Sequence, residues 1–367
     1  MKLALALVVV AFTAALIPSS RAQQREDGVF VGTIGSSAVV MTLNSYDATD
    51  AFGYYYYRRV GRDIELSGSK RGTAWTLTER AGKVGEQDRA TLSFSLTPGR
   101  VTGAWKDAKS GRSLPVTLRA VTPSDLAALK LGGAQSNIWA RGNPYEALRF
   151  DAPFKVSSTQ TVGGKRAQWV TEPKSGVRLP RLPGESAAVN DALQLEHLKA
   201  ANAALSCILD DYEHSAKLEL YSGRLVSVSA TTAFYCGGAH PDNSNDNFTV
   251  DLRTARTLEI EELYRFTTVK RETNPERDGF EAYAQARAAT VRKLILAEDG
   301  TLLKGLDPGC KEVYDDNSAL TYFTWYLTPQ GLVVQSSLPH VAAVCEQDYL
   351  LPYARLRAYL APNSLLR

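Results

Sequence analysis

The chain has 367 residues, of which 44% are hydrophobic, so it is long enough for two or three domains with packed cores. Its formal net charge is +3, and the 42 basic and 39 acidic residues are interleaved rather than gathered in blocks. Lys2 and Arg21 lie in a leader that we expect to be removed, which leaves the mature chain near +1. This balance argues against a nucleic-acid partner and against strong charge steering of any ligand.

Residues 1–22 are typical of a secretory signal peptide. Lys2 gives a short positive start, Leu3–Ile17 is uncharged and mostly apolar, and Pro18–Ala22 ends in the small-x-small pattern that signal peptidase reads. The apolar run has about 15 residues, whereas a membrane-spanning helix needs ~20. We therefore expect cleavage after Ala22 and a periplasmic or secreted protein with no membrane span in its mature chain.

Residues 23–120 are predicted to form an all-β domain, either a meander or a small barrel. Short runs of strand-forming residues, such as Phe30–Gly35 and Ala38–Leu43, recur at intervals of roughly 8–12 residues with glycine-containing turns between them. The run Tyr54–Tyr57 offers aromatic faces that can stack on sugars. Alternation along a strand would place two of its four side chains in a core, so packing is the role that we expect for them.

Residues 121–150 are expected to be a connector. A short helix is predicted through Leu129, with Ser124 or Asp125 near its cap, and Gly132–Gly133 would end it. A turn is predicted at Asn143–Tyr145.

Residues 151–367 are predicted to form an α+β domain in which an antiparallel sheet carries two main helices. The helices are expected at Glu185–Leu205 and Pro275–Ala297, the second with Asn274 as its cap, and a short terminal helix at Leu351–Leu360. The expected strands are Ala167–Val170, Lys217–Tyr221, Leu225–Cys236, Phe248–Leu252, Tyr322–Leu327 and Gly331–Ser336.

The four cysteines are predicted to form two disulfides, because an even count in an exported chain favours bridges. Of the three possible connectivities we expect Cys207–Cys236 and Cys310–Cys345, since each pair is nearest in sequence and lies in one structural unit. There is no Cys-x-x-Cys pattern and no histidine at ligand spacing from a cysteine, which argues against a zinc site.

Candidate catalytic groups are sparse. The sequence has no Gly-x-Ser-x-Gly elbow, and His240 is predicted to hydrogen-bond the backbone and fix its turn rather than to act as a general base. The acidic run Asp210–Glu213 with His214 is expected to be a solvated loop. Asp242–Asn247 is expected to be a polar turn, because it lacks the glycine and glutamate of a calcium loop. We therefore expect no catalytic residue, no metal and no cofactor.

Three motifs in the last part of the chain occur in an informative order. Cys236–Pro241 reads Cys-Gly-Gly-Ala-His-Pro between two predicted strands, Leu327–Leu332 contains Thr-Pro-Gln-Gly-Leu, and Pro352–Leu360 contains Pro-Tyr-x-x-Leu-x-x-Tyr-Leu. This order resembles the C-terminal domain of the RsiV-type lysozyme-sensing anti-sigma factors, over roughly residues 150–367. Thr254–Arg256 stands where that family carries a glycine, and Pro339–Cys345 replaces a segment rich in glycine and aromatic residues.

The resemblance implies an extracytoplasmic binding protein of the cell envelope, with a lysozyme-like protein or cell-wall glycan (peptidoglycan) as its partner. The family domain also occurs attached to polysaccharide deacetylases, so one alternative is an accessory or catalytic component of an envelope glycan hydrolase or deacetylase. A structural envelope protein is another. We expect binding in two loops, Gly237–Asn247 and Pro339–Val344. The candidate binding residues are Gly237, Gly238, His240, Asp242, Asn245, Pro339 and His340.

Overall fold

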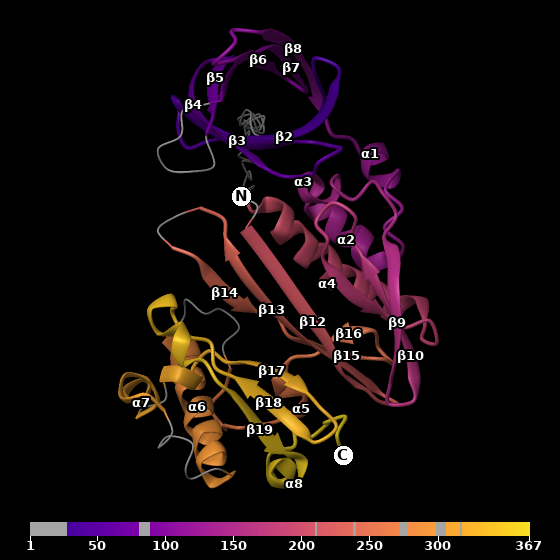
Figure 1. The fold of residues 1–367 in the computed structure, drawn as a ribbon, viewed down its shortest axis with the longest axis vertical. Coiled ribbons are helices and arrows are strands. Elements are labelled where there is room, and N and C mark those ends of the chain that lie inside the picture. Colours follow the sequence, from indigo (N-terminus) through magenta and orange to yellow (C-terminus); the bar gives the residue numbers. More distant parts are fainter. Residues whose placement is uncertain are drawn as a thin grey trace, which may run out of the picture.

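The computed structural model describes residues 28–80, 89–209, 211–237, 240–271, 278–298, 306–315 and 318–367. The predicted signal peptide and the predicted cap Asn274 lie outside these residues. Figure 1 shows three parts along the long axis: a barrel at one end, a layer of sheets and helices in the middle, and a mixed lobe that contains the C-terminus.

The first part is a closed antiparallel barrel, which confirms the all-β prediction. Each strand pairs with the next one along the chain, and the last strand closes the barrel by pairing with the first. Side chains alternate between a buried and a more exposed face, as in Ala90–Thr97, so the inward positions form a continuous apolar interior. The strands are β1 Gly28–Ile34, β2 Ser37–Ser45, β3 Asp50–Tyr57, β4 Ile64–Arg71, β5 Ala74–Glu79, β6 Ala90–Thr97, β7 Arg100–Asp107 and β8 Ser113–Ala120.

The tyrosine run in β3 is used for packing. Tyr55 lies in the barrel interior, whereas Tyr56 belongs to a second buried cluster outside the barrel. Both side chains are fully buried, so neither presents a ring to a sugar. Tyr56 donates a hydrogen bond to the carbonyl of Tyr145, 2.8 Å away, and so joins the barrel to the next segment.

The segment that we expected to be a connector is a packed helical layer. It contains α1 Pro123–Ala127, α2 Ala134–Gly142 and α3 Pro144–Ala147. Leu148 and Phe150 are buried in one cluster with Tyr56 of the barrel and Leu198 of the following long helix. The sequence did not reveal this role, because its apolar residues follow no single period.

The middle layer contains two sheets and one long helix. One sheet has the order β11-β10-β9, and the other has β13 at its centre, paired with β12, β14 and β15. The helix α4 covers one face of the second sheet through the apolar cluster that Val189 and Leu193 form with Val226 and Val250. The elements are β9 Lys155–Val162, β10 Lys165–Thr171, β11 Arg178–Arg181, α4 Ala187–Ser206, β12 Asp211–Tyr221, β13 Leu225–Tyr235, β14 Asp242–Asn245, β15 Phe248–Asp251 and β16 Arg256–Thr257.

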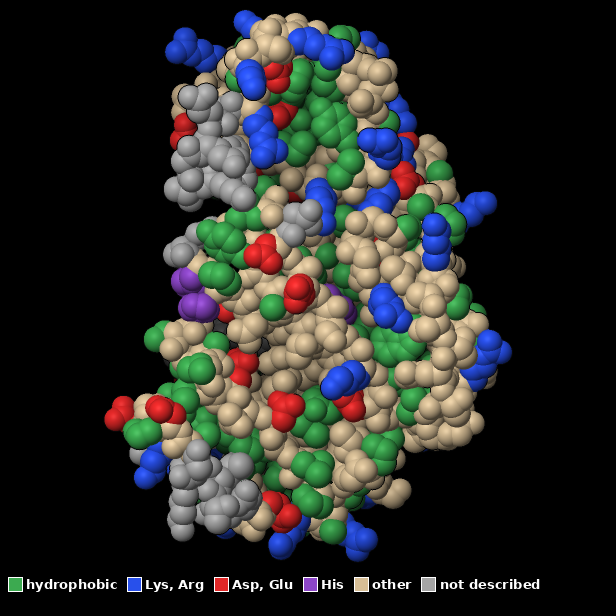
Figure 2. All heavy atoms as spheres, viewed as in Figure 1, with side chains coloured by type: hydrophobic (Ala, Val, Ile, Leu, Met, Phe, Trp, Pro, Cys, Tyr) green, Lys and Arg blue, Asp and Glu red, His purple; other side chains and the backbone are tan. Residues whose placement is uncertain are grey.

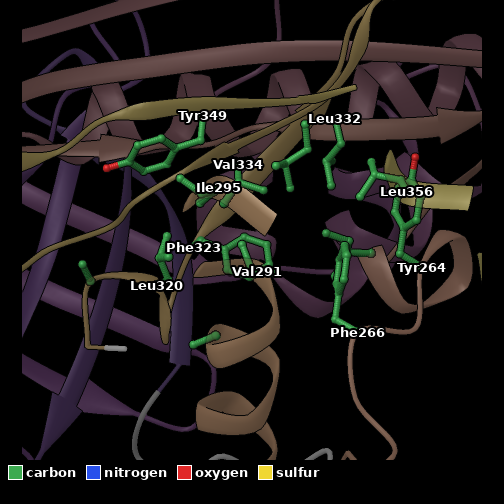
Figure 3. Packing of buried hydrophobic residues seen from close by; sticks show 14 of the residues in the cluster. Tyr264, Phe266, Val291, Ile295, Leu320, Phe323, Leu332, Val334, Tyr349 and Leu356 are labelled. Carbon is green, nitrogen blue, oxygen red and sulfur yellow. The ribbon is translucent and has the colours of Figure 1, made fainter. Parts of the chain in front are cut away.

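The last lobe is built around α6 and a three-stranded sheet. Figure 3 shows its core, in which Val291 and Ile295 of α6 share a buried cluster with Val334 and Tyr349 of the sheet. The predicted hairpin around Pro329 is confirmed. The elements are α5 Ile260–Leu263, α6 Asp278–Glu298, α7 Pro308–Asp315, η2 Ser318–Leu320, β17 Thr324–Leu327, β18 Gly331–Gln335, η3 His340–Cys345, β19 Asp348–Pro352, α8 Tyr353–Leu356 and η4 Arg357–Tyr359.

Several predicted loops are regular structure. Asp211–His214 forms the first part of the strand β12 and is not a solvated loop. A strand can hold these charged residues because side chains alternate between its two faces, and Asp211 and Glu213 occupy exposed positions. Most of the polar turn expected at Asp242–Asn247 is the strand β14. The second predicted loop, Pro339–Val344, is mostly the 3₁₀ helix η3, which begins at His340 and has Pro339 as its N-cap. Leu351 lies in the strand β19, and the terminal helix α8 begins two residues later, at Tyr353.

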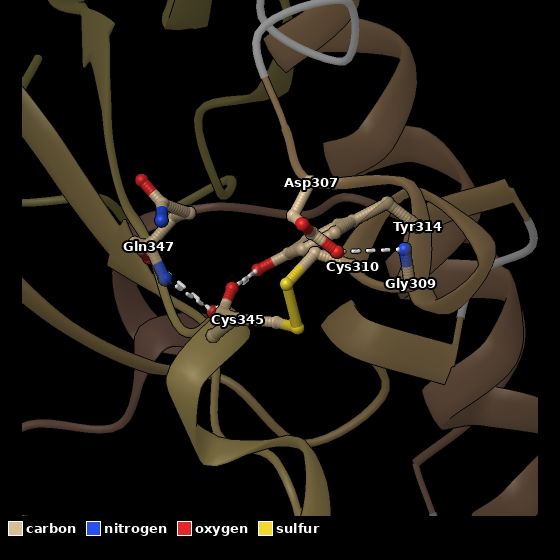
Figure 4. Close-up of a disulfide and its surroundings, with 7 residues drawn as sticks. Asp307, Gly309, Cys310, Tyr314, Cys345 and Gln347 are labelled. Carbon is tan, nitrogen blue, oxygen red and sulfur yellow. Dashed lines mark hydrogen bonds between the residues drawn. A yellow bond between two sulfur atoms is a disulfide. The ribbon is translucent and has the colours of Figure 1, made fainter.

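Both predicted disulfides are confirmed. Cys207 pairs with Cys236, and Cys310 pairs with Cys345. Figure 4 shows that the second bridge joins α7 to the end of η3, with the hydroxyl of Tyr314 donating a hydrogen bond to the carbonyl of Cys345 at 2.9 Å. Each bridge closes a long loop and constrains the unfolded chain.

Candidate functional site

The two loops singled out by the sequence meet in space. The ring of His240 stacks on the ring of His340, with 3.7 Å between the centroids and 11° between the planes. Figure 2 shows two histidine side chains side by side at its left edge. Asp242 Oδ1 lies 3.7 Å from His340 Nδ1, so three of the predicted binding residues form one exposed cluster.

A carboxylate fixes these loops to each other. Oε2 of Glu346, which follows η3, accepts hydrogen bonds from the side-chain amides of Asn243 at 3.1 Å and Asn245 at 3.4 Å. Its other oxygen accepts from the backbone N–H of Leu338 at 2.8 Å. The predicted residue Asn245 and Asn243, which lies in the same predicted loop, thus hold β14 beside η3, and Glu346 is a member of the site that the sequence did not reveal.

The remaining predicted residues shape the turn. Gly237 is exposed and has a φ of +106°, a conformation that favours glycine. Gly238 lies outside the described residues. As predicted, Nδ1 of His240 contacts the backbone, 3.0 Å from the carbonyl oxygen of Pro241. Pro339 caps η3 and positions His340 at its first turn.

A groove of about 590 Å³ runs beside the loops, and we call it the polar groove. Asn243 and Asn245 belong both to its wall and to the Glu346 bridge, so the first loop lines the groove, whereas the second loop touches the first without lining the groove. In the middle of the face shown in Figure 2 the surface is mostly tan, the colour shared by uncharged polar side chains and the backbone, with a few charged side chains among it. The groove is lined by Ser175, Gly176, Val177, Tyr212, Glu213, His214, Ser215, Thr231, Thr232, Ala233, Asn243, Ser244 and Asn245.

Strand alternation explains this lining. In β13 the buried Thr232 stands between the exposed residues Thr231 and Ala233. Opposite them, β12 presents Glu213 and Ser215 at exposed positions. A strand face with small hydroxyl side chains provides hydrogen-bond donors and acceptors without a large apolar surface.

Two histidines near the groove are neutral at pH 7. Burial lowers the pKa of His214, an effect that the charge of Asp246 opposes. Burial and the nearby Arg181 lower the pKa of His197 to about 3. His197 lies 2.9 Å from the carbonyl of Val177 through Nε2. Neither imidazole therefore adds positive charge to the groove.

In the part of the chain that the structure describes, no three His, Cys, Asp or Glu side chains gather in a way that could hold a metal ion. Among the same residues, no helix is long and apolar enough to cross a membrane.

Neither a protein-family model nor a curated protein matches the chain. Several chains of solved structures are similar to it, among them the following two. A DUF3298 family protein from Pseudomonas aeruginosa PAO1 is 15% identical with a TM-score of 0.34, covering 58% of this chain and 97% of that one. A member of the same family from Bacteroides fragilis NCTC 9343 is 13% identical with a TM-score of 0.34, covering 58% of this chain and 95% of that one. At this level the likeness assigns neither a fold nor an activity to the chain.

Proposed function

We propose that this chain is an exported binding protein of the cell envelope that holds a strand of cell-wall glycan in its polar groove. One observation carries the proposal: the first of the two contacting loops lines a groove of about 590 Å³ whose wall consists largely of hydroxyl and amide groups. Sugars present hydroxyls and amides, which such side chains can hydrogen-bond. The two disulfides support a location outside the cytoplasm.

The charge of the groove favours an uncharged strand. Among the described residues that line it, Glu213 alone carries a formal charge, and the burial-lowered pKa of His214 keeps that ring neutral. A polyanion such as nucleic acid would meet no basic side chain there. This agrees with the near-neutral mature chain.

A lysozyme-like protein is a second candidate partner, and one feature of η3 favours it. Val341 is 88% exposed and Val344 is 87% exposed, beside His340. Exposed apolar side chains next to a cluster of polar groups are typical of a protein-binding edge. The resemblance to the lysozyme-sensing family supports the same candidate.

The alternatives from the sequence make different predictions. An accessory module of a glycan hydrolase or deacetylase would bind glycan through the same groove. A purely structural envelope protein would bind neither glycan nor lysozyme. Binding therefore separates the structural role from the others.

The test is co-sedimentation of residues 23–367 with insoluble peptidoglycan at two salt concentrations. Ser215→Arg with Thr231→Arg would fill the groove and weaken binding by about tenfold or more. Thr102→Arg is the matched control, because Thr102 is an exposed threonine on the barrel strand β7. Absence of sedimentation, or equal binding by the groove variant and the wild type, would overturn the glycan proposal.

A parallel experiment addresses the second partner. Co-elution with a panel of lysozymes is measured for the wild type and for Val341→Asp with Val344→Asp. Lysozyme binding that the valine variant abolishes, with peptidoglycan binding absent, would replace the glycan proposal by the protein one.

A further inference from the structure

A second, smaller cavity adjoins the polar groove. It measures about 190 Å³ and lies between α4 and the sheet formed by β12, β13 and β15. Tyr212 and His214 line both cavities and so mark the boundary between them. We call this cavity the side pocket. Its lining residues are Leu179, Glu196, Lys199, Ala200, Ala203, Tyr212, His214, Ala230, Asp246 and Phe248.

The side pocket combines small apolar walls with charges that already have partners. Ala200, Ala230 and Phe248 supply carbon surface. The ammonium of Lys199 lies 3.0 Å from the carboxylate of Glu196, and Asp246 accepts a hydrogen bond from the hydroxyl of Ser244 at 2.9 Å. A carboxylate entering the pocket would face these two acidic groups, so the pocket disfavours an anionic guest.

His214 gives the side pocket an unsatisfied polar atom. Its Nδ1 is buried and has no hydrogen-bond partner among the described residues. A buried polar atom without a partner is unfavourable, and a ligand that supplies the partner removes the cost. The nitrogen can pair with an amide group, as donor or acceptor according to its tautomer.

We propose that the side pocket recognises the acetamido group of an N-acetylated sugar, which makes the groove selective for N-acetylated glycan. The methyl group of the acetamide would lie against the alanines and Phe248, and its amide would supply the missing partner of His214 Nδ1. A sugar that carries a hydroxyl in place of the acetamido group would make no contact with the apolar wall of the side pocket. This inference rests on the glycan function proposed above.

The test compares two neutral oligosaccharides of equal length by calorimetry with residues 23–367: a tetramer of N-acetylglucosamine and a tetramer of glucose. The acetylated tetramer is expected to bind at least about tenfold more tightly. His214→Phe keeps a ring of similar size but removes the nitrogen, and Ala203→Leu fills the pocket from an exposed helix position. Both variants are expected to reduce the preference to about twofold or less.

Ala188→Leu is the matched control, because Ala188 is an exposed alanine of α4 that does not line the side pocket. Equal affinity for the two tetramers, with peptidoglycan still bound, overturns the acetamido inference and leaves the glycan function standing. If both pocket variants still prefer the acetylated tetramer, the preference does not come from the side pocket, and that assignment is overturned. Loss of all glycan binding, peptidoglycan included, overturns the proposed function and this inference with it.

Discussion

Replacing Asp63 by asparagine would leave Arg149 as a buried charge without a counterion. The guanidinium of Arg149 lies 2.6 Å from Asp63 Oδ1, and the two side chains are 1% and 8% exposed. Arg149 also donates to the carbonyl of Gly61 at 3.1 Å, and its guanidinium carbon lies 4.8 Å from the ring centroid of Tyr56. This buried ion pair is therefore a main link between the helical layer and the barrel.

The expected cost follows from this burial. Removing one partner of a buried ion pair destabilises a protein by roughly 3–5 kcal/mol. Asparagine keeps an oxygen that can accept the 2.6 Å hydrogen bond of the Tyr145 hydroxyl, so we expect the lower end, about 3 kcal/mol. Asp63→Asn combined with Arg149→Met removes the unpaired charge, and the double variant should lose less than the sum of the single ones.

Urea unfolding followed by tryptophan fluorescence measures these changes. Lys199→Ala is the control, because its partner Glu196 lies three residues earlier on α4 and the lysine side chain is 51% exposed. That variant should lose less than about 0.5 kcal/mol. If Asp63→Asn loses no more than the control, the junction is not held by this ion pair and the reasoning is refuted.

Three further predictions concern α4 and the last lobe. Ser186→Ala removes the hydroxyl that accepts from the backbone N–H of Val189 and should lower the free energy of unfolding by about 1 kcal/mol, measured in urea; no change would show that this cap is dispensable. His197 has a folded pKa of about 3, below its usual value near 6.5, so the unfolded chain binds the extra proton and stability falls as pH drops below about 6.5. Between about pH 6.5 and pH 4.5 the wild type should lose about 2 kcal/mol more than His197→Gln, and equal losses in the two proteins would contradict the buried neutral imidazole. Replacing Cys310 and Cys345 by serine should lower the free energy of unfolding by about 2–4 kcal/mol, and a thermal midpoint equal to that of the wild type would argue against the bridge.

The sequence predicted features whose signals are local. The barrel strands carry alternation and glycine turns, and each of Cys310 and Cys345 is the nearest cysteine to the other in sequence, so both features could be predicted without knowledge of the fold. Closure of the barrel could not, because β1 and β8 are far apart in sequence and their pairing leaves no local pattern. In the helical layer at 121–150 the sequence predicted the short first helix, found as α1, but not the packing of the layer, because its buried residues are defined by contact with the barrel and α4.

In the candidate site, too, the sequence revealed residues that have a local signal and missed residues that only the fold brings together. His240 and Pro339 stood out because histidine beside glycine or proline marks a shaped loop. Glu346 carried no such signal, and only the fold, which brings η3 beside β14, makes it the acceptor for Asn243. His214 was expected to be solvent-exposed. It is partly buried because its position in β12 turns toward the side pocket, a direction that depends on the strand register.

Each of the two disulfides lies at one end of one of the two loops. Cys236 immediately precedes Gly237 and is bridged to Cys207 at the end of α4, so the first loop starts from a point covalently attached to the helix. Cys345 ends η3 and is bridged to α7, so the second loop ends at a similar anchor. Anchors of this kind reduce the conformational entropy that a loop loses when it binds. From this position we infer that the bridges hold the site in a preformed shape as well as stabilising the fold. Reduction of the disulfides should then weaken ligand binding even where the protein remains folded.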